Sequence, residues 1–227
     1  MPGNPIMYAD KRLKNDIEII ILDNGSTDGT GEALDSLSKT VSNVQLIHAD
    51  HVLGDGPAKN VLIKSSLGRI FILVDPSVEF TGPVLTSLSE LLSDDSVGIA
   101  GYAGLKTPDL LHFHGGEGES GEMDAMQAYC FAFRREHLKT VGFMRESFRF
   151  YRNLDLDFSF HFKDKGYTIF ANPSLPVKQH EHRVWSALAE GVREELSRKN
   201  YGRFLRKWGN RADLLMVAQN SEQLHLR

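Results

Sequence analysis

Apolar residues in the first half of the chain fall into short runs separated by polar, helix-like stretches. Residues 17–22 are isoleucine and leucine broken only by Glu18, a pattern typical of a strand buried on both faces of a parallel sheet. Gly25 then supplies a turn, and residues 26–28 can cap the helix that follows. Two more such runs, each preceded by a helical pattern, predict stacked right-handed βαβ units. The predicted strands are residues 17–22, 44–48 and 69–74, and the predicted helices are residues 31–37 and 57–66.

The second half is less regular. Phe158, Phe160 and Phe162 alternate as in a strand, yet Leu154, Phe158 and Phe162 lie four residues apart as on one face of a helix. Asn153 as N-cap and Gly166 as C-cap favour the helix. Residues 105–124 are rich in glycine and acid, with almost nothing to bury, and we expect a mobile surface loop there. The remaining predictions are strands at 97–102, 126–134 and 167–171, and helices at 83–92, 135–141 and 187–208.

Composition changes this picture little. A chain of 227 residues with a formal net charge of −4 is long enough for one full core and gives no support to nucleic-acid binding. Cys130 is the single cysteine, which excludes a disulfide framework and an all-cysteine metal site. No apolar stretch is long enough for a membrane span, and the N-terminus lacks a signal-peptide pattern. The expectation is a cytoplasmic α/β domain at residues 17–182, a loosely ordered segment at 1–16 with a short helix near 8–13, and a helical extension at 183–227.

The predicted C-terminal helix carries a basic face, which has two interpretations. The first is an ordinary solvated face, and the second is docking on anionic lipid at the inner face of the membrane, as a peripheral contact. A homo-oligomer is left open. The basic residues are Arg193, Arg198, Lys199, Arg203, Arg206 and Lys207.

Polar residues that can carry chemistry stand at the ends of the predicted strands and turns. Each has an ordinary structural explanation: Asp23 can cap a turn, and Asp155 and Asp157 can oppose a helix dipole for only about 0.3–1 kcal/mol each. A functional site is favoured because the first three groups converge on the carboxyl edge of one sheet, where open α/β proteins bind ligands. The groups are Asp23 with Asn24, Lys59 with Asn60, Asp75 to Glu79, and His180 to His182.

Several motifs in order resemble family 2 glycosyltransferases. The stretch IEIIILDNGSTDGT is followed by Ala-Lys-Asn and then GRIFILVD, which resembles the nucleotide-binding half of that family. Later, GFMRESFRFYRNLDLDFSFHFKDKGYTI resembles its acceptor half, and NYGRFLRKWG resembles the tail of bacterial members. The resemblance covers residues 16–209. It implies a GT-A fold, a Rossmann-like three-layer αβα sandwich with a mostly parallel mixed sheet. It also implies a nucleoside diphosphate-sugar donor and a glycan, lipid-linked or small-molecule acceptor.

The resemblance also implies roles for individual residues. Asp23 and Asn24 match the positions at the base and ribose of the nucleotide, and Lys59, with Asn60 beside it, stands where the family commonly has arginine near the nucleotide. Asp155 matches the general base, with Asp157 as a nearby supporting acid. A carboxylate within hydrogen-bond reach can take the proton from an acceptor hydroxyl. If the reaction follows the family, the anomeric configuration is inverted.

The implied cofactor is a divalent metal, Mn²⁺ or Mg²⁺, because a hard cation held by carboxylates neutralises a leaving diphosphate. Asp75 matches the first acid of the family's Asp-x-Asp motif, but Ser77 replaces the second acid. Glu79 is a candidate substitute for that acid, and His180, with His182 as its alternative, is a candidate late metal ligand.

A second departure concerns the start of the chain. The family normally begins with a strand that ends in a Pro-x-Tyr/Phe-Asn turn, and nothing in residues 1–16 matches it. Two alternatives to the glycosyltransferase therefore stand. One is a degenerate domain that binds a sugar, a nucleotide or a protein without turnover. The other is a nucleotidyltransferase, which is disfavoured because no glycine-rich phosphate loop follows the first strand.

Overall fold

The computed structural model describes residues 17–116, 118–182 and 186–217. The short helix expected near residues 8–13 lies outside the described residues. Among the described residues, none of the helices combines the length and the apolar character that crossing a membrane requires.

The strands are β1 (Ile19–Asp23), β2 (Val44–His48), β3 (Ile70–Val74), β4 (Val78–Phe80), β5 (Val97–Gly101), β6 (Gly104–Lys106), β7 (His114–Gly115), β8 (Gly121–Met123), β9 (Ala125–Met126), β10 (Cys130–Arg134), β11 (Thr168–Ala171) and β12 (Val177–Gln179). The helices are α1 (Thr30–Ser38), α2 (Asp55–Ser65), α3 (Val84–Leu91), α4 (Leu138–Val141), α5 (Leu154–Lys163) and α7 (Glu190–Trp208), with short 3₁₀ helices at Arg135–His137 and Ala212–Leu214.

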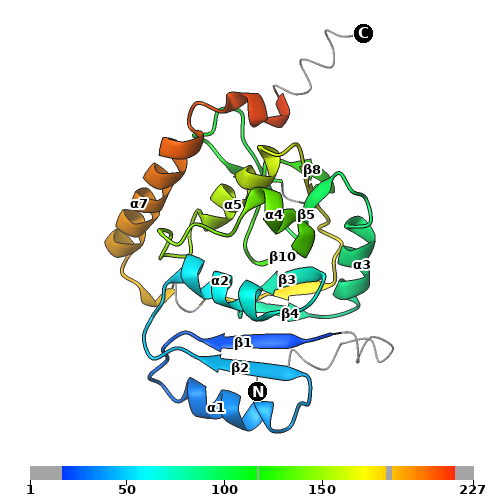
Figure 1. Cartoon of the computed structure of the whole chain (residues 1–227). Helices are drawn as coiled ribbons and strands as arrows, with labels where there is room; N and C mark the ends of the chain where they lie inside the picture. Colours follow the sequence, from blue (N-terminus) through cyan, green and yellow to red (C-terminus); the bar gives the residue numbers. More distant parts are fainter. Residues whose placement is uncertain (1–16, 117, 183–185, 218–227) are drawn as a thin grey trace.

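The main sheet is mixed and has five strands in the order β3-β10-β5-β11-β8. Strand β10 is antiparallel to both β3 and β5, whereas β11 runs parallel to β5. Strands β1 and β2 form a separate parallel pair that lies with α1 at one end of the molecule (Figure 1). Two small sheets, β12-β4 and β7-β6-β9, complete the topology. The predicted α/β class with a mixed sheet is confirmed.

The core is built on the two faces of the main sheet. Along β10, Phe131 and Phe133 pack toward α5, while Cys130 and Ala132 pack toward α3, because successive strand residues point to opposite faces. The ring of Phe133 meets that of Phe158 edge-on, with centroids 5.2 Å apart and planes at 71°. Helix α5 and helix α3 therefore cover opposite faces of the sheet, which gives three layers. The predicted helix at residues 153–167 is confirmed as α5.

The expectation of a mobile surface loop at residues 105–124 is wrong. The segment contributes β6, β7 and β8, and β8 joins the main sheet antiparallel to β11. Leu110 and Met123 are buried in the core. The carboxylate of the buried Asp124 accepts the Thr107 N–H at 2.9 Å and pairs with the Lys163 ammonium at 3.3 Å. The sequence pattern missed these elements because their partners lie far away in the sequence.

Strand β1 also differs from its prediction. Its residues Ile19 to Leu22 are only partly buried, although the sequence predicted burial on both faces. The chain just before β1 is held by the Glu18 carboxylate, which accepts hydrogen bonds at 2.6 Å from the Ser66 hydroxyl and from the N–H groups of Leu67 and Gly68. This contact ties the beginning of β1 to the beginning of β3.

Candidate functional site

The carboxyl end of β1 places Asp23 beside β2 rather than in open solvent. Asp23 is only 7% exposed. Its Oδ1 accepts the Ser26 N–H at 3.0 Å, and its Oδ2 lies 3.0 Å from Nδ1 of His48, its register partner on β2. Hydrogen bonds from Ser26 and His48 lower the pKa of Asp23, and those to Asp23 and Asp35 raise the pKa of His48. The Asp23 carboxylate is thus held ionised at the edge of the site.

The turn after β1 is fixed against the loop that leads into α2. The Asn24 side-chain oxygen accepts the Leu53 N–H at 2.8 Å. Gly25 has a φ of +75°, and a Cβ there would lie 2.6 Å from the His51 carbonyl carbon. Only glycine suits this conformation and this close approach. Asn24 therefore shapes the rim of the site through the backbone that it holds.

Helix α2 sends its two candidate residues in different directions. The Lys59 ammonium pairs with the Asp55 carboxylate one turn earlier, and both side chains are mostly buried. Asn60 is buried, and its amide donates to the Met144 carbonyl at 2.9 Å while its oxygen accepts the Met144 N–H at 3.1 Å. Because this amide is occupied in holding the chain at Met144, Asn60 is not available to a nucleotide, contrary to the sequence prediction.

The four candidate metal ligands come together as two acid–histidine pairs. Asp75 follows β3, and its Oδ1 accepts the N–H of Ser77 at 2.8 Å, while its Oδ2 lies 3.4 Å from Nε2 of His182. Glu79 on β4 lies 2.8 Å from Nε2 of His180, which follows β12. The antiparallel pairing of β4 with β12 brings these residues, distant in sequence, to one place.

This arrangement fits a divalent metal only in part. Within the described residues, no group of three His, Cys, Asp or Glu side chains could enclose a metal ion. Asp75 and His182 nevertheless offer two ligand atoms, and Mg²⁺ is commonly held by one or two carboxylates together with substrate phosphates. The chemistry of this pair suits a cation that arrives with a diphosphate. Glu79 and His180 contact each other in a separate pair.

Tyr151 is a component of the site that the sequence did not reveal. Its ring stacks on the imidazole of His182, with centroids 4.4 Å apart and planes at 14°. Burial raises the pKa of the Tyr151 hydroxyl to about 12, so the phenol stays neutral. The contact fixes the orientation of His182 beside Asp75. No sequence period signals this pair, because the two residues lie in irregular segments.

Asp155 opens α5, and its carboxylate is held by backbone hydrogen bonds in a desolvated environment. Its carboxylate accepts the Ala128 N–H at 3.2 Å and the Leu156 N–H at 3.0 Å. Desolvation raises the pKa of Asp155, while the backbone hydrogen bonds and the charges of Arg152 and Lys59 act in the opposite direction. A carboxylate with a raised pKa is a better proton acceptor near neutral pH.

Asp157 serves the fold instead of the site. It is fully buried, and its carboxylate accepts the Arg145 Nε–H and the Trp208 indole N–H, each at 2.9 Å. Although burial opposes it, hydrogen bonds from His161 and Arg145 lower the pKa of Asp157. A helix turns about 200° over two residues, so Asp155 and Asp157 must face opposite directions. The resemblance implies a nearby acid that supports the site, whereas these contacts tie Asp157 to Arg145 and Trp208.

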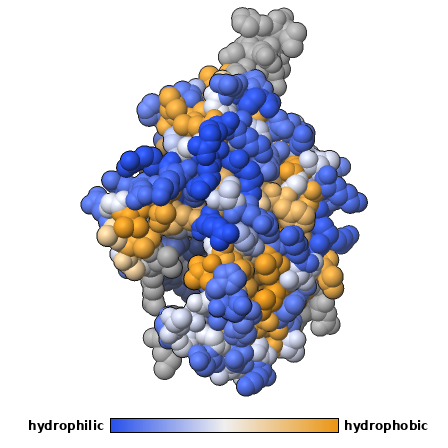
Figure 2. Space-filling model, turned by 60° about the vertical axis from the view of Figure 1, so that its left-hand side comes forward, coloured by the Kyte–Doolittle hydropathy of each residue, from blue (hydrophilic) through white to orange (hydrophobic). Residues whose placement is uncertain are grey.

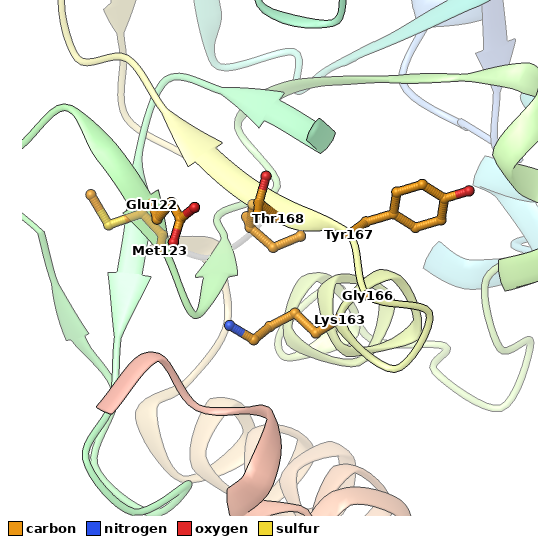
Figure 3. A pocket seen from close by; sticks show the side chains of 7 residues that line it. Glu122, Met123, Lys163, Gly166, Tyr167 and Thr168 are labelled. Carbon is orange, nitrogen blue, oxygen red and sulfur yellow. The ribbon is translucent and has the colours of Figure 1, made fainter. Parts of the chain in front are cut away.

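Two pockets of the described part of the chain lie away from these acids. Figure 3 shows a small pocket between β8, β11 and the end of α5, lined by Glu122, Lys163 and Tyr167 among others. The Lys163 ammonium there is already paired with Asp124. A second, open pocket of about 410 Å³ lies between α5 and the end of α7, beside His161, Lys207 and Arg211. Asp75 and Asp155 line neither of them. Figure 2 shows the molecule turned so that the carboxyl ends of β1 and β2 come forward. On this face the surface is hollowed between the unit formed by β1, α1 and β2 and the rest of the molecule.

Comparison with solved structures concerns the fold. The GalNAc-T7 crystal structure with UDP, GalNAc and Mn²⁺ superposes with a TM-score of 0.73 at 16% identity, over 92% of this chain and 44% of that one. The mannosyltransferase PcManGT from Pyrobaculum calidifontis, in complex with GDP-Man and Mn²⁺, gives 0.58 at 20% identity, over 71% of this chain and 47% of that one. These likenesses confirm the predicted GT-A fold.

Sequence comparison identifies the family. Glycosyltransferase GlyG of Streptococcus pneumoniae serotype 4 (strain ATCC BAA-334 / TIGR4) is 35% identical over 65 residues, which is 29% of this chain and 22% of that protein. The chain thus spans less than half the length of these three relatives. The family model described as glycosyl transferase family 2 matches residues 9–152, well over half of the chain. The chain belongs to glycosyl transferase family 2.

Proposed function

We propose that this chain transfers a sugar from a nucleoside diphosphate-sugar to an acceptor hydroxyl, with inversion at the anomeric carbon. One observation carries the proposal. Asp75 donates its N–H to the Tyr129 carbonyl at 2.8 Å, and Asp155 accepts the N–H of the adjacent Ala128 at 3.2 Å. Two consecutive residues therefore hold the donor-side acid and the acceptor-side acid next to each other, as a transfer between two bound substrates requires.

Each group has a separate task in this reaction. Asp155 takes the proton of the acceptor hydroxyl as that oxygen attacks the sugar. Asp23, held ionised between Ser26 and His48, receives the base of the nucleotide at the end of β1. Asp75 and His182 are the residues that would hold a divalent cation. When bound, that cation would neutralise the charge developing on the diphosphate.

The support from relatives is limited to what their structures contain. GalNAc-T7 was solved with UDP, GalNAc and Mn²⁺, and PcManGT with GDP-Man and Mn²⁺. We extend the use of a nucleotide-bound donor and a manganese ion to this chain because Asp75 and His182 supply only two ligands. A two-ligand site predicts that Mn²⁺ binds weakly alone and much more tightly together with a nucleoside diphosphate.

Calorimetry with UDP-, GDP- and dTDP-sugars, with and without Mn²⁺, tests the proposal together with donor hydrolysis. We expect Asp155→Asn to keep donor binding and to lower turnover by about 10²–10⁴-fold, the usual contribution of a general base. Glu90→Gln is the matched control, since Glu90 is an exposed acid on α3, and it should leave turnover unchanged. Failure of every nucleotide to bind would contradict the proposal.

A second function, binding without turnover, is favoured by Ser77. Ser77 stands where the family has its second acid. Its hydroxyl and its N–H both donate hydrogen bonds to one carboxylate oxygen of Asp75, which matches the first acid. In that case the nucleotide would bind, no donor would be hydrolysed, and Asp155→Asn would change nothing. The same calorimetry and hydrolysis measurements distinguish the two functions.

The basic face of α7 bears on the kind of acceptor. Lys199 pairs with Glu195 at 2.6 Å, and Arg203 donates to the Asn200 side chain at 2.8 Å, both within the helix. These contacts support an ordinary solvated face. Binding to vesicles that increases with their content of anionic lipid would instead support a lipid-linked acceptor at a membrane surface.

A further inference from the structure

The turn from Phe150 to Asn153 connects two parts of the proposed site. Tyr151 lies in this turn, and its ring stacks on the imidazole of His182. Asn153 ends the turn and directly precedes α5, in which Asp155 is the second residue. The backbone position of this turn therefore affects both the donor side and the acceptor side of the site.

The start of α5 is held by helix α7, which packs beside it (Figure 1). The first N–H groups of a helix have no partner within the helix, and the side chain of the N-cap residue commonly binds one of them. Asn153 is the N-cap residue, with a left-handed φ of +66°, but among the described residues its side chain makes no capping hydrogen bond. Its amide instead donates to the Ser197 carbonyl on α7 at 3.1 Å.

Asn200, also on α7, makes a second attachment to the same turn. Its side-chain nitrogen donates to the carbonyls of Phe150 and Arg152, at 2.7 Å and 2.8 Å. Its side-chain oxygen accepts a hydrogen bond from the Arg203 guanidinium at 2.8 Å. Asn200 is only 1% exposed. Both hydrogens of a buried amide are thus bound to the two carbonyls that flank Tyr151.

Packing alone does not explain an asparagine at this position. Helix α7 buries Asn200, Phe204 and Trp208, which lie four residues apart and therefore on one face. Burying an amide on such a face is unfavourable unless its hydrogen bonds are made, so the bonds account for the residue. We propose that Asn200 is a positioning residue of the transfer reaction, which fixes the turn at Tyr151 and, through it, the carboxylate of Asp155.

The position of Asp155 depends on this turn because the first turn of a helix is its least constrained part. The Asp157 N–H donates to the Asn153 carbonyl at 3.3 Å, so the helical ladder begins at the residue that α7 holds. A general base must lie within hydrogen-bond reach of the acceptor hydroxyl, and a displacement of about 1 Å can lower the rate about a hundredfold. The inference rests on the proposed function, but the placement of Asp155 can be measured without turnover.

Hydrogen exchange of the full chain measures that placement, because the Ala128 N–H donates to the Asp155 carboxylate at 3.2 Å. We expect Asn200→Ala to accelerate exchange of the Ala128 amide about tenfold relative to the amides of β10. Donor hydrolysis is measured with the UDP-, GDP- or dTDP-sugar that the wild-type chain cleaves with Mn²⁺. Its kcat should fall about ten- to a hundredfold, while the KM for the donor changes less than about twofold.

Tyr201→Phe is the matched control on the same helix. The Tyr201 hydroxyl donates to the carbonyl of Leu110, which also has a left-handed φ, +64°, but lies in a different segment. This variant should change neither the exchange of the Ala128 amide nor kcat. Asn153→Gly keeps the left-handed backbone and removes only the bond to α7, so it should give smaller changes in the direction of Asn200→Ala. It also provides the test if Asn200→Ala does not fold.

Four outcomes would overturn the proposal. An unchanged Ala128 amide in both asparagine variants, or equal acceleration at Ala128 and throughout β10, would show that Asn200 serves only the fold. The same acceleration in Tyr201→Phe would show a general loosening of α7. An increased KM with an unchanged kcat would assign Asn200 to donor binding. If the wild-type chain hydrolyses no donor, the proposed function fails, and exchange at Ala128 alone decides whether α7 positions Asp155.

Discussion

The two parts of the molecule that carry the proposed site differ in how firmly they are packed. In the body, β10 and α5 interdigitate through rings such as Phe133 and Phe158, and nearly every residue of α5 is buried. In the unit formed by β1, α1 and β2, Asp23 alone is buried among the residues of these elements. Asp155 lies in the tightly packed body, and Asp23 lies in the loosely packed unit of β1, α1 and β2. The chemistry is thus proposed to rest on the rigid scaffold, and nucleotide binding on the part that a ligand can order.

The largest expected effect comes from removing core volume in each part. Phe158→Ala should lower the free energy of unfolding by about 3–5 kcal/mol, because it leaves a cavity between α5 and the sheet. Ile20→Ala on β1 should cost only about 1 kcal/mol, since that side chain is already partly exposed. Urea unfolding followed by circular dichroism measures both. Equal losses would show that β1 is packed as tightly as α5.

The next effect separates the two acids of α5. Asp157→Asn should lower the free energy of unfolding by about 3 kcal/mol, because Arg145 then loses its buried charge partner. Asp155→Asn should be close to neutral for stability, since desolvation already disfavours the charge of that carboxylate. The two variants are matched controls for each other in the same unfolding measurement. A larger loss for Asp155→Asn would reverse the roles assigned here.

The smallest effect is a pH dependence confined to the β1–β2 pair. The pKa of His48 is raised in the folded chain, so its stabilising contribution is present below the unfolded value of about 6.5 and is lost as pH rises through the folded value. The pKa of Asp23 is lowered, so its contribution is lost only in acid, as pH falls through the folded value. Hydrogen exchange of β1 and β2, corrected for the intrinsic effect of pH, should therefore show weaker protection at pH 8 than at pH 6. His48→Asn should abolish that difference, and a difference that persists in the variant would contradict this origin.

Local pattern was sufficient wherever an element and its chemistry lie close together in the sequence. The apolar runs located β1, β2 and β3, and the polar residues behind them located Asp23 and Asp75. The spacing of Leu154, Phe158 and Phe162 correctly identified α5 and placed Asp155 at its start. These predictions succeed because hydrophobic periodicity and turn chemistry act over only a few residues.

Local pattern failed wherever a partner far along the chain decides the role of a residue. Asn60 is of a residue type that often binds ligands, but its side-chain amide is hydrogen-bonded to the backbone of Met144. The composition of residues 105–124 predicts a loop. In the structure, however, Asp124 pairs with Lys163, and β8 from this segment pairs with β11. Asp155 and Asp157 are alike in sequence, and only the packing of Arg145 and Trp208 around one of them makes it structural.

By itself, the sequence determined the α/β class, the order of the first strands and helices and the position of acids at strand and helix ends, because each depends on neighbouring residues. The predicted stacking of β3 on the β1–β2 pair was wrong, since β3 joins the main sheet beside β10. Only the tertiary structure decided that Ala128 and Tyr129 bring Asp155 and Asp75 together, and that Tyr151 stacks on His182. It alone showed that β1 pairs with β2 whereas β3 pairs with β10. These features depend on contacts between distant segments, and a pattern that extends over a few residues contains no information about which distant segments will meet.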